Sequence, residues 1–329
     1  MNHHYVFVGT DNDFFRTLYK GFEEKSDCTL QLIAPTTMKR PFIDKVLTSK
    51  KIPLYNFRLA IRENINFRSL MKSQNDNQLG NYKSNIVIIY SRVYERFGTA
   101  VLKYYRKRYS NCKLVCYYGD LIECHCCDIQ DIKKHFDLVA SFDKEQAAKY
   151  DIAYIHEPYS YTPKENKVAP IYDIFFVGAA KGERRLNMIH KIYNRLSSLN
   201  FKCLFYIVGV DEKNQINRQI IYNQPIPYHD VIEKIQKSRF ILEVMQDDAV
   251  SPSSRFSESV IFNKGLITDC RVFTDDFLPP NVIRFNKIED IDTEKIEKLS
   301  FSKNDLEKYR YPLSIDNMIT NIYLLLGLR

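Results

Sequence analysis

The stretch SPSSRFSESVIFNKGLITD, residues 251–269, is the most informative part of the chain for its fold, together with the strand-like RFILEV of residues 239–244 before it. Ser251 suits the N-cap of a helix, and Pro252 suits the first helical position because proline lacks the N–H that would be unpaired there. The helix is expected to run to about Asn263, with the following Lys-Gly pair as its stop and GLIT as the next strand. The stretch therefore predicts a strand, a helix and a second strand in succession.

Arg255 and Glu258 lie three residues apart in this helix, so their side chains share one face near its N-terminus. Backbone N–H groups, the positive end of the helix dipole and an arginine together favour a phosphate group. A carboxylate one turn further along can accept hydrogen bonds from sugar hydroxyls. The pair therefore indicates a sugar-nucleotide site, with both side chains facing the ligand and neither needed for the core. A surface helix with an ordinary ion pair explains the same residues.

The composition is that of an ordinary globular protein: 329 residues, 45% hydrophobic and 27% charged. This length allows one large or two medium domains, each able to bury a core. The longest apolar runs are far shorter than the roughly 20 residues that cross a bilayer. The N-terminal MNHHYVFVG is expected to enter a strand at once rather than to form a signal peptide, and the eight cysteines fit a reducing cytoplasm.

Residues 1–158 are predicted to form a doubly wound, Rossmann-like α/β domain. It opens with a strand at residues 5–8, a helix at about residues 13–25 and a strand at residues 28–33, the alternation that begins such a domain. Residues 35–82 give no readable pattern. Three acidic residues follow predicted strands, at the edge of the sheet where this architecture binds ligands. These candidate catalytic residues are Asp11, Asp13 and Asp120.

Four cysteines in this domain allow two interpretations. The spacing of Cys112, Cys116, Cys124 and Cys127 forms a loose C-x3-C and C-x2-C zinc pattern. Cys112 and Cys116 also fall on one face of a predicted buried strand, where a cysteine serves as a small hydrophobic residue. The second interpretation is favoured, and no metal site is predicted.

Residues 159–170 contain prolines and are predicted to link the first domain to a second Rossmann-like domain of residues 171–312. The first strand of this domain, residues 172–178, is followed by a cationic loop and by a helix over about residues 184–199. Cations at a strand-to-helix junction can bind a diphosphate. The loop contributes the donor-binding candidates Gly178, Lys181, Arg184 and Arg185.

The run IPYHDVIEKIQKSRFILEVMQ (residues 226–246), with SRFSESVIFNKGLITD after it, resembles the donor-binding half of GT-B glycosyltransferases. It is most similar to bacterial enzymes that assemble capsular, exopolysaccharide or lipopolysaccharide glycans. In that pattern a tyrosine-led helix precedes a strand, a helix with a glutamate and a short strand; Tyr228 and Glu258 match its tyrosine and glutamate. Many retaining families carry a second glutamate eight residues earlier, where this chain has Val250. The resemblance covers residues 136–270 well and the rest only by topology.

The resemblance implies a GT-B fold, in which two Rossmann-like domains face each other across a cleft and residues 313–329 form a helix that packs back on the first domain. It implies a glycosyltransferase, of hexosyltransferase type, with a nucleotide-diphosphate sugar as donor and a glycan or lipid-linked saccharide as acceptor. The donor would be bound by the cationic loop and by Tyr228, Ser254, Arg255 and Glu258. The surplus of cations near two helix N-termini suggests that no metal or other cofactor is needed. A general base for an inverting reaction would come from the first domain.

The net charge of +8 is unevenly distributed. Residues 39–72 hold nine Lys or Arg against two acids, and a predicted basic helix at residues 94–109 adds five more beside two tyrosines. Such a surface suits an anionic membrane or a nucleic-acid backbone, although a solvated helix face explains it equally well. The expected location is the cytoplasm, peripheral at the inner face of the membrane, without a nucleic-acid partner. The alternatives are a nucleic-acid-binding protein that uses the basic half, or a sugar-nucleotide epimerase on the same fold.

Overall fold

The computed structural model describes residues 3–33, 82–160, 169–180, 182–246, 249–274 and 278–328, with the single residues 46, 53, 54, 61, 65 and 67. Three expectations therefore fall wholly or largely outside the described residues. These are the donor-loop cation Lys181, residues 161–168 of the predicted linker, and nearly all of the basic stretch 39–72.

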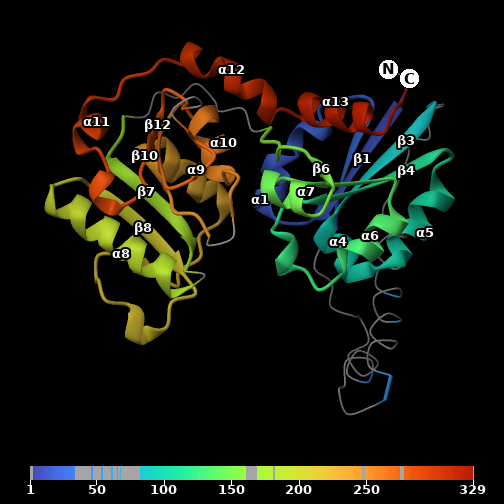
Figure 1. Cartoon of the computed structure of the whole chain (residues 1–329), viewed down its shortest axis with the longest axis horizontal. Helices are drawn as coiled ribbons and strands as arrows, with labels where there is room; N and C mark the ends of the chain where they lie inside the picture. The colour runs from blue at the N-terminus through green and yellow to red at the C-terminus, as the bar shows by residue number, and fades with distance from the viewer. Residues whose placement is uncertain are drawn as a thin grey trace. The chain divides into compact units, whose positions relative to one another are not determined.

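The chain forms two compact units, each with its own six-stranded parallel sheet (Figure 1). The first unit comprises Met1–Phe142, Gln146–Ile155 and Ile319–Arg329, and the second comprises Asp143–Glu145 and His156–Met318. The predicted α/β class with two Rossmann-like sheets is confirmed.

The strands of the first unit are β1 His3–Thr10, β2 Cys28–Ile33, β3 Ser84–Tyr90, β4 Cys112–Tyr118, β5 Leu138–Ser141 and β6 Ala153–Tyr154. Their order in the sheet is β2-β1-β3-β4-β5-β6. The chain passes from β1 outward to β2 and then returns to the other side of β1, so the winding reverses between β1 and β3. Buried side chains fill β1 and β3 almost completely, as expected for parallel strands covered on both faces.

The described helices of the first unit are α1 Asp13–Leu18, α4 Ser91–Phe97, α5 Thr99–Arg108, α6 Ile129–His135 and α7 Lys144–Lys149, with the 3-10 turns η1 Lys20–Phe22 and η2 Ile122–Cys124. The first two residues of α7 belong to the second unit. The basic helix predicted for residues 94–109 is in fact two helices, because Gly98 adopts a left-handed φ of 55° that ends the first one. The helix predicted for residues 13–25 stops at Leu18. The tighter turn that follows packs the ring of Phe22 near Phe7, with centroids 5.5 Å apart.

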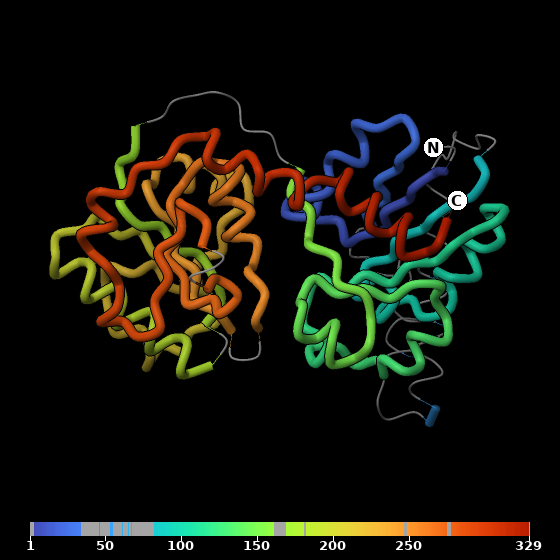
Figure 2. The backbone as a smooth tube through the Cα atoms, turned by 45° about the horizontal axis from the view of Figure 1, so that its top comes forward, coloured from blue at the N-terminus to red at the C-terminus, as the bar shows by residue number. Residues whose placement is uncertain are grey.

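The C-terminal helix, α13 Ile315–Leu325, contributes its last turns to the first unit. Figure 2 shows this helix beside the first strand, with both ends of the chain in the same unit. The ring of Tyr323 lies 5.5 Å from that of His3 in an edge-on contact. The helix therefore covers the start of the sheet from the other end of the sequence.

The strands of the second unit are β7 Tyr172–Ala179, β8 Cys203–Val208, β9 Ile221–Tyr222, β10 Ser238–Glu243, β11 Gly265–Thr268 and β12 Val282–Arg284. Their order is β12-β11-β10-β7-β8-β9, which is the Rossmann arrangement with its switch between β7 and β10. The short strand β9 was not predicted from the sequence.

The helices of the second unit are α8 Glu183–Ser198, α9 Tyr228–Gln236, α10 Ser254–Ile261, α11 Thr293–Lys298 and α12 Glu307–Arg310, with the 3-10 turns η3 Glu212–Asn214, η4 Ile288–Asp290, η5 Asn304–Leu306 and η6 Tyr311–Leu313. In Figure 1, α8 lies on one face of the sheet, and α9 and α10 lie on the other. The helix predicted for about residues 184–199 is confirmed as α8, and it buries Leu186, Ile189 and Leu196 in one cluster with Phe205 of the sheet.

The end of α10 differs from the prediction. The helix stops at Ile261 and Asn263 adopts a φ of 56°, so asparagine turns the chain where the Lys-Gly pair was expected to do so. Gly265 is the first residue of β11 and pairs with Phe240 of β10. A Cβ at Gly265 would lie 2.2 Å from that ring. The glycine is thus required by strand packing.

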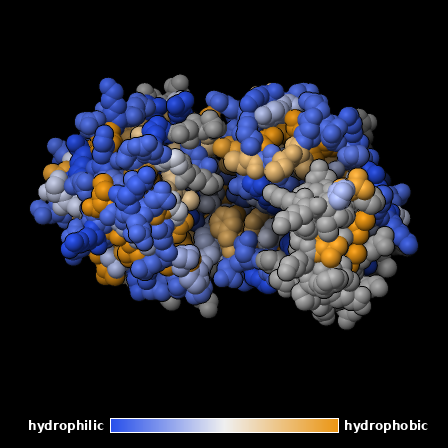
Figure 3. Space-filling model, turned by 90° about the horizontal axis from the view of Figure 1, so that it is seen from below, coloured by the Kyte–Doolittle hydropathy of each residue, from blue (hydrophilic) through white to orange (hydrophobic). Residues whose placement is uncertain are grey.

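Hydrophilic residues cover most of the described surface seen in Figure 3, and hydrophobic residues form small groups between them. Large exposed hydrophobic residues such as Ile171, Ile216 and Leu324 come from separate parts of the chain. Such scattered residues are normal on a protein surface. Within the described parts of the chain, no helix has the length and apolar character needed to span a bilayer.

Candidate functional site

The carboxyl ends of β7 and β10 lie side by side at the winding switch of the second sheet. Doubly wound sheets bind their ligands at this place. The segments that leave these two strands contain the predicted donor residues Gly178, Arg184, Arg185, Ser254 and Arg255. The topology therefore brings together residues that are far apart in the sequence.

Arg185, in the first turn of α8, ties the two strand ends together. Its Nε donates to the carbonyl oxygen of Val244 at 2.8 Å, and its Nη1 donates to the carbonyl of Ala179. A methyl group at Gly178 would lie 3.1 Å from the Phe176 ring and 3.4 Å from the remaining terminal nitrogen of Arg185. Glycine therefore leaves room for the guanidinium. Burial lowers the pKa of Arg185, and part of its hydrogen-bonding capacity serves the backbone.

The start of α10 is set by a residue on a neighbouring strand. The helix begins at Ser254 with Ser253 as its N-cap, so the prediction of Ser251 as N-cap and Pro252 as first helical residue was wrong. Ser253 donates to Glu243 Oε1 from its backbone N at 2.8 Å and from its hydroxyl at 2.6 Å. The hydroxyl of Ser251 instead accepts a backbone N–H from the start of α7 at 2.9 Å. A buried carboxylate of β10 therefore selects the cap.

A chain of four side chains runs inward from Arg255. Its Nη1 donates to Oε2 of Glu258, and the hydroxyl of Tyr228 donates to Oε1 of the same carboxylate at 2.6 Å. The hydroxyl of Tyr159 lies 2.9 Å from that of Tyr228. Because Tyr228 gives its proton to Glu258, Tyr159 is the donor in this last bond. Protein groups thus engage both oxygens of Glu258.

The two members of the predicted pair differ in exposure. The side chain of Arg255 is 17% exposed, whereas that of Glu258 has no exposed surface. The expectation that both face the ligand, outside the core, was therefore wrong for Glu258. Burial raises the pKa of Glu258, although Arg255 and Tyr228 favour its charged form. Burial opposes the charge of Arg255 as well, but the combined attraction of Glu258, Tyr228, Tyr159 and Glu243 outweighs it and raises the pKa of Arg255.

Two further carboxylates lie at this edge of the sheet and were not predicted. Glu243 is 3% exposed, and its Oε2 accepts from the hydroxyl of Thr268 at 2.6 Å. Asp269, which follows β11, accepts a backbone N–H from just after β10 at 2.7 Å. Burial raises the pKa of both carboxyl groups, while the positive charges of Arg184 and Arg185 act to lower that of Asp269. The edge thus combines fixed cations with buried acids.

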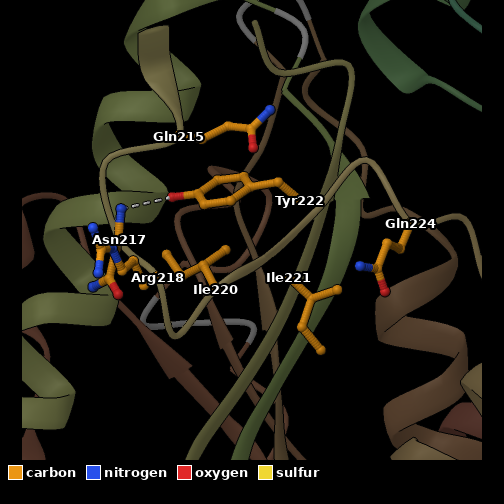
Figure 4. A pocket seen from close by; sticks show the side chains of 7 residues that line it. All are labelled: Gln215, Asn217, Arg218, Ile220, Ile221, Tyr222 and Gln224. Carbon is orange, nitrogen blue, oxygen red and sulfur yellow. Dashed lines mark hydrogen bonds between the residues drawn. The ribbon is translucent and has the colours of Figure 1, made fainter. Parts of the chain in front are cut away.

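A cavity of about 390 Å³ lies beside β9 in the same unit (Figure 4). Amide, guanidinium and apolar side chains line it: Gln215, Asn217, Arg218, Ile220, Ile221, Tyr222 and Gln224. The hydroxyl of Tyr222 accepts the backbone N–H of Asn217 at 3.4 Å and lies 2.8 Å from Nε2 of His190. Amide side chains offer both donors and acceptors, as the edge of a nucleobase requires.

The predicted catalytic carboxylates occupy the carboxyl edge of the first sheet. Asp11 forms an ion pair of 2.6 Å with Arg16, and Asp120 forms one of 3.3 Å with Arg92. Asp13 is exposed at the first position of α1. The structure therefore gives two of the three candidates a cationic partner on a neighbouring helix.

Next to Asp120, the structure gathers a histidine cluster. Nδ1 of His125 lies 3.3 Å from Oε2 of Glu95, and its Nε2 lies 3.3 Å from the hydroxyl of Ser91. Arg92 donates to the same Glu95 oxygen at 2.8 Å. Burial lowers the pKa of His125, whose side chain is 2% exposed. The cluster therefore fixes the ends of β3 and β4 and offers no reachable base.

The cysteines fit the buried-thiol interpretation. None of the eight forms a disulfide. Cys116 is buried in β4 and Cys112 is half-buried there, where burial raises the pKa of its thiol to about 12, while Cys124 is exposed. In the part of the chain that the structure describes, no three His, Cys, Asp or Glu side chains are grouped as metal ligands.

No family model and no curated protein matches the chain. Among solved structures, an α-glucosyltransferase in complex with UDP and a 13-mer DNA containing an A:G mismatch is similar over 99% of both chains, with 12% identity and a TM-score of 0.55. An α-glucosyltransferase in complex with UDP and a 13-mer DNA containing an HMU base is similar over 98% of this chain and 99% of that one, with 11% identity and a TM-score of 0.54. A Listeria monocytogenes protein assigned as a UDP-N-acetylglucosamine 2-epimerase is similar over 97% of this chain and 94% of that one, with 11% identity and a TM-score of 0.53. The chain has the GT-B fold.

Within this GT-B fold, sequence reasoning missed Tyr159 and Glu243. Glu243 carried a usable signal, because a carboxylate in an otherwise apolar strand needs buried partners. Tyr159 carried none, since its partner Tyr228 lies 69 residues away. Only the folded chain brings them together.

Proposed function

We propose that the chain is a glycosyltransferase that moves a hexosyl group from a nucleotide-diphosphate sugar to a glycan or lipid-linked saccharide in surface polysaccharide synthesis. The observation that carries the proposal is Arg255, which Glu258 holds in the first turn of α10 with part of its side chain exposed. Arg185 lies close enough to both Arg255 and Arg184 for their charges to interact. Donor binding by this group agrees with the GT-B fold.

The chemistry assigned to these cations is stabilisation of the leaving group. When the bond from the sugar to the diphosphate breaks, negative charge develops on the phosphate oxygen, and fixed cations stabilise that charge without reorganising. Arg255 and Arg184 are the described candidates, and Lys181 is a third outside the described residues. The cavity beside β9 is the candidate for the nucleobase.

For the acceptor, we propose Asp11, Asp13 or Asp120 as the general base if the reaction inverts the anomeric centre. A base must approach the acceptor hydroxyl to about 3 Å. Replacing each with asparagine identifies it: the base variant should lose turnover by a hundredfold or more with unchanged donor affinity. If all three variants keep full turnover, the base lies elsewhere or the reaction retains configuration.

The test of the proposed function is a thermal-shift panel of UDP, GDP, CMP and their sugars. A ligand at a hundredfold its dissociation constant stabilises a protein by about 2.7 kcal/mol. We expect one nucleotide diphosphate to raise the melting temperature, and its sugar to be consumed only when an acceptor is present. Consumption without acceptor would favour an epimerase, and no shift with any nucleotide would contradict the proposal.

We further propose that turnover needs no divalent metal, because cations already occupy the leaving-group side. Asp11 and Asp13 have the Asp-x-Asp spacing of metal-dependent transferases, but Asp11 is paired with Arg16. Activity should persist in EDTA. Complete loss that magnesium or manganese restores would overturn this part of the proposal.

We also propose that the protein works in the cytoplasm, peripheral to an anionic membrane. On α5, Lys103, Arg106 and Lys107 are exposed, whereas the guanidinium of Arg108 packs over Tyr104 at 5.9 Å from its centroid. Anionic vesicles should carry the protein upward in flotation at low salt and less at high salt. Equal flotation with neutral vesicles would contradict an electrostatic surface. Duplex DNA that binds at physiological salt would favour the nucleic-acid alternative.

A further inference from the structure

We propose that Glu258 is a positioning residue for Arg255 and not a ligand of the donor's ribose or sugar hydroxyls; this inference rests on the proposed function. The carboxylate has no exposed surface, and both of its oxygens accept hydrogen bonds from protein groups. A hydroxyl of the donor would have to displace Tyr228 or Arg255 to reach it. Arg255 keeps exposed surface, so the ligand meets the arginine and not the acid.

The carboxylate can position Arg255 because it is itself fixed from behind. Tyr228 is 8% exposed and Tyr159 is 2% exposed, so the hydroxyl chain that ends on Glu258 is shielded from water. The backbone N–H of Tyr159 donates to the carbonyl of Leu313 at 2.8 Å, and its ring meets that of Phe262 edge-on at 6.3 Å. These contacts anchor the far end of the chain in the core of the second unit.

A guanidinium presents its five N–H donors in one plane, so a bond from one terminal nitrogen to Glu258 restricts where the others point. An arginine oriented before the ligand arrives loses less conformational freedom on binding and stabilises the departing diphosphate without reorganisation. The acid also balances the charge of Arg255, which is only 17% exposed. Both effects act on the terminal phosphate, and neither acts on the ribose.

The experiment compares nucleoside mono- and diphosphates. Dissociation constants of UMP, UDP, GMP, GDP and inorganic pyrophosphate are measured for the parent, Glu258→Gln, Tyr228→Phe and Tyr159→Phe. For the base that the parent binds, Glu258→Gln should lower the preference for diphosphate over monophosphate by roughly tenfold, with monophosphate affinity unchanged within about twofold. Tyr228→Phe should lower the preference less and Tyr159→Phe least, in the order of the hydrogen-bond chain.

Arg255→Lys is the matched control, because it keeps the charge beside Glu258 but loses the planar fork. It should lower the same preference, and adding Glu258→Gln to it should have little further effect. Melting temperatures establish which variants fold; Tyr159→Phe removes only one hydroxyl and keeps the test available if Glu258→Gln does not fold.

Equal weakening of monophosphate and diphosphate by Glu258→Gln, with lost discrimination against the 2′-deoxy and 3′-deoxy monophosphates, would show a ribose ligand and overturn the inference. Unchanged constants in all three chain variants would overturn it as well. A parent that binds neither diphosphate nor pyrophosphate would instead refute the proposed function, and this inference with it.

Discussion

The carboxyl edges of the two sheets hold their charged residues in opposite ways. In the first unit, Asp120 and Arg92 form a pair whose side chains are 45% and 36% exposed. In the second, Glu258 and Glu243 are buried and accept hydrogen bonds from hydroxyls, backbone and Arg255. Exposed pairs contribute little and rearrange easily, whereas satisfied buried networks are rigid. The second edge is therefore organised before a ligand arrives, whereas the exposed Asp120–Arg92 pair of the first edge can rearrange around one.

The largest effect should come from Arg255→Ala, which removes the cation of the buried network at the second edge. The contact that strengthens as the diphosphate leaves is worth about 2–4 kcal/mol, so turnover should fall by roughly a hundredfold or more. Turnover and donor affinity are measured beside Arg16→Ala, which removes an exposed cation of the first unit and should change donor affinity little.

The same change leaves Glu258 buried beside no cation and is expected to destabilise the fold. Arg255→Lys keeps that charge and separates folding from function, because it should melt near the parent temperature and still lose turnover. A folded Arg255→Ala variant with parental donor affinity would reduce the pair to a structural ion bridge.

Glu243→Ala is next. It removes the acceptor of three hydrogen bonds, two from Ser253 and one from Thr268, at buried positions. Groups left unsatisfied there should lower the free energy of unfolding by about 2–4 kcal/mol, measured by urea denaturation. Glu243→Gln keeps the shape and one acceptor and should lose less. If Glu243→Ala lowers the free energy of unfolding by less than the roughly 0–1 kcal/mol of an exposed ion pair, the second edge is no more organised than the first.

The pH dependence of His125 is a smaller effect and tests the buried histidine of the first edge. Burial lowers its folded pKa below the ordinary 6.5, so the unfolded chain binds a proton that the folded chain does not. The stability that depends on keeping His125 neutral is therefore fully present above about pH 6.5 and is lost as the pH falls toward the folded pKa. Between pH 7.5 and 5, the parent should lose more stability than His125→Gln. Parallel curves would contradict the lowered pKa.

Asp120→Asn should have the smallest effect on stability. An exposed ion pair is worth about 0–1 kcal/mol, so the free energy of unfolding should change by no more than that. A larger loss of stability would show that the first edge is organised like the second. A loss of turnover without a loss of stability would identify Asp120 as the base.

The alternation of strands and helices in both units, and hence the α/β class, could be predicted from the sequence alone. Apolar runs such as β3 and the periodic stripe of α8 bury their residues wherever they pack, so local pattern was sufficient. It also placed Arg255 near the start of a helix and Gly178 at the end of a strand, because caps and strand ends depend on near neighbours.

Which groups those residues contact depends instead on how the chain folds. Ser253 caps α10 because Glu243 at the end of β10 fixes it, and Gly265 is needed because Phe240 packs against it. Glu258 is inaccessible because Tyr159 and Tyr228 close over it from distant parts of the chain. Spacing along a helix predicts which face a side chain shares with its neighbours. Whether that face meets solvent or core depends on segments that no local pattern contains, since contacts over such separations form only when the chain folds.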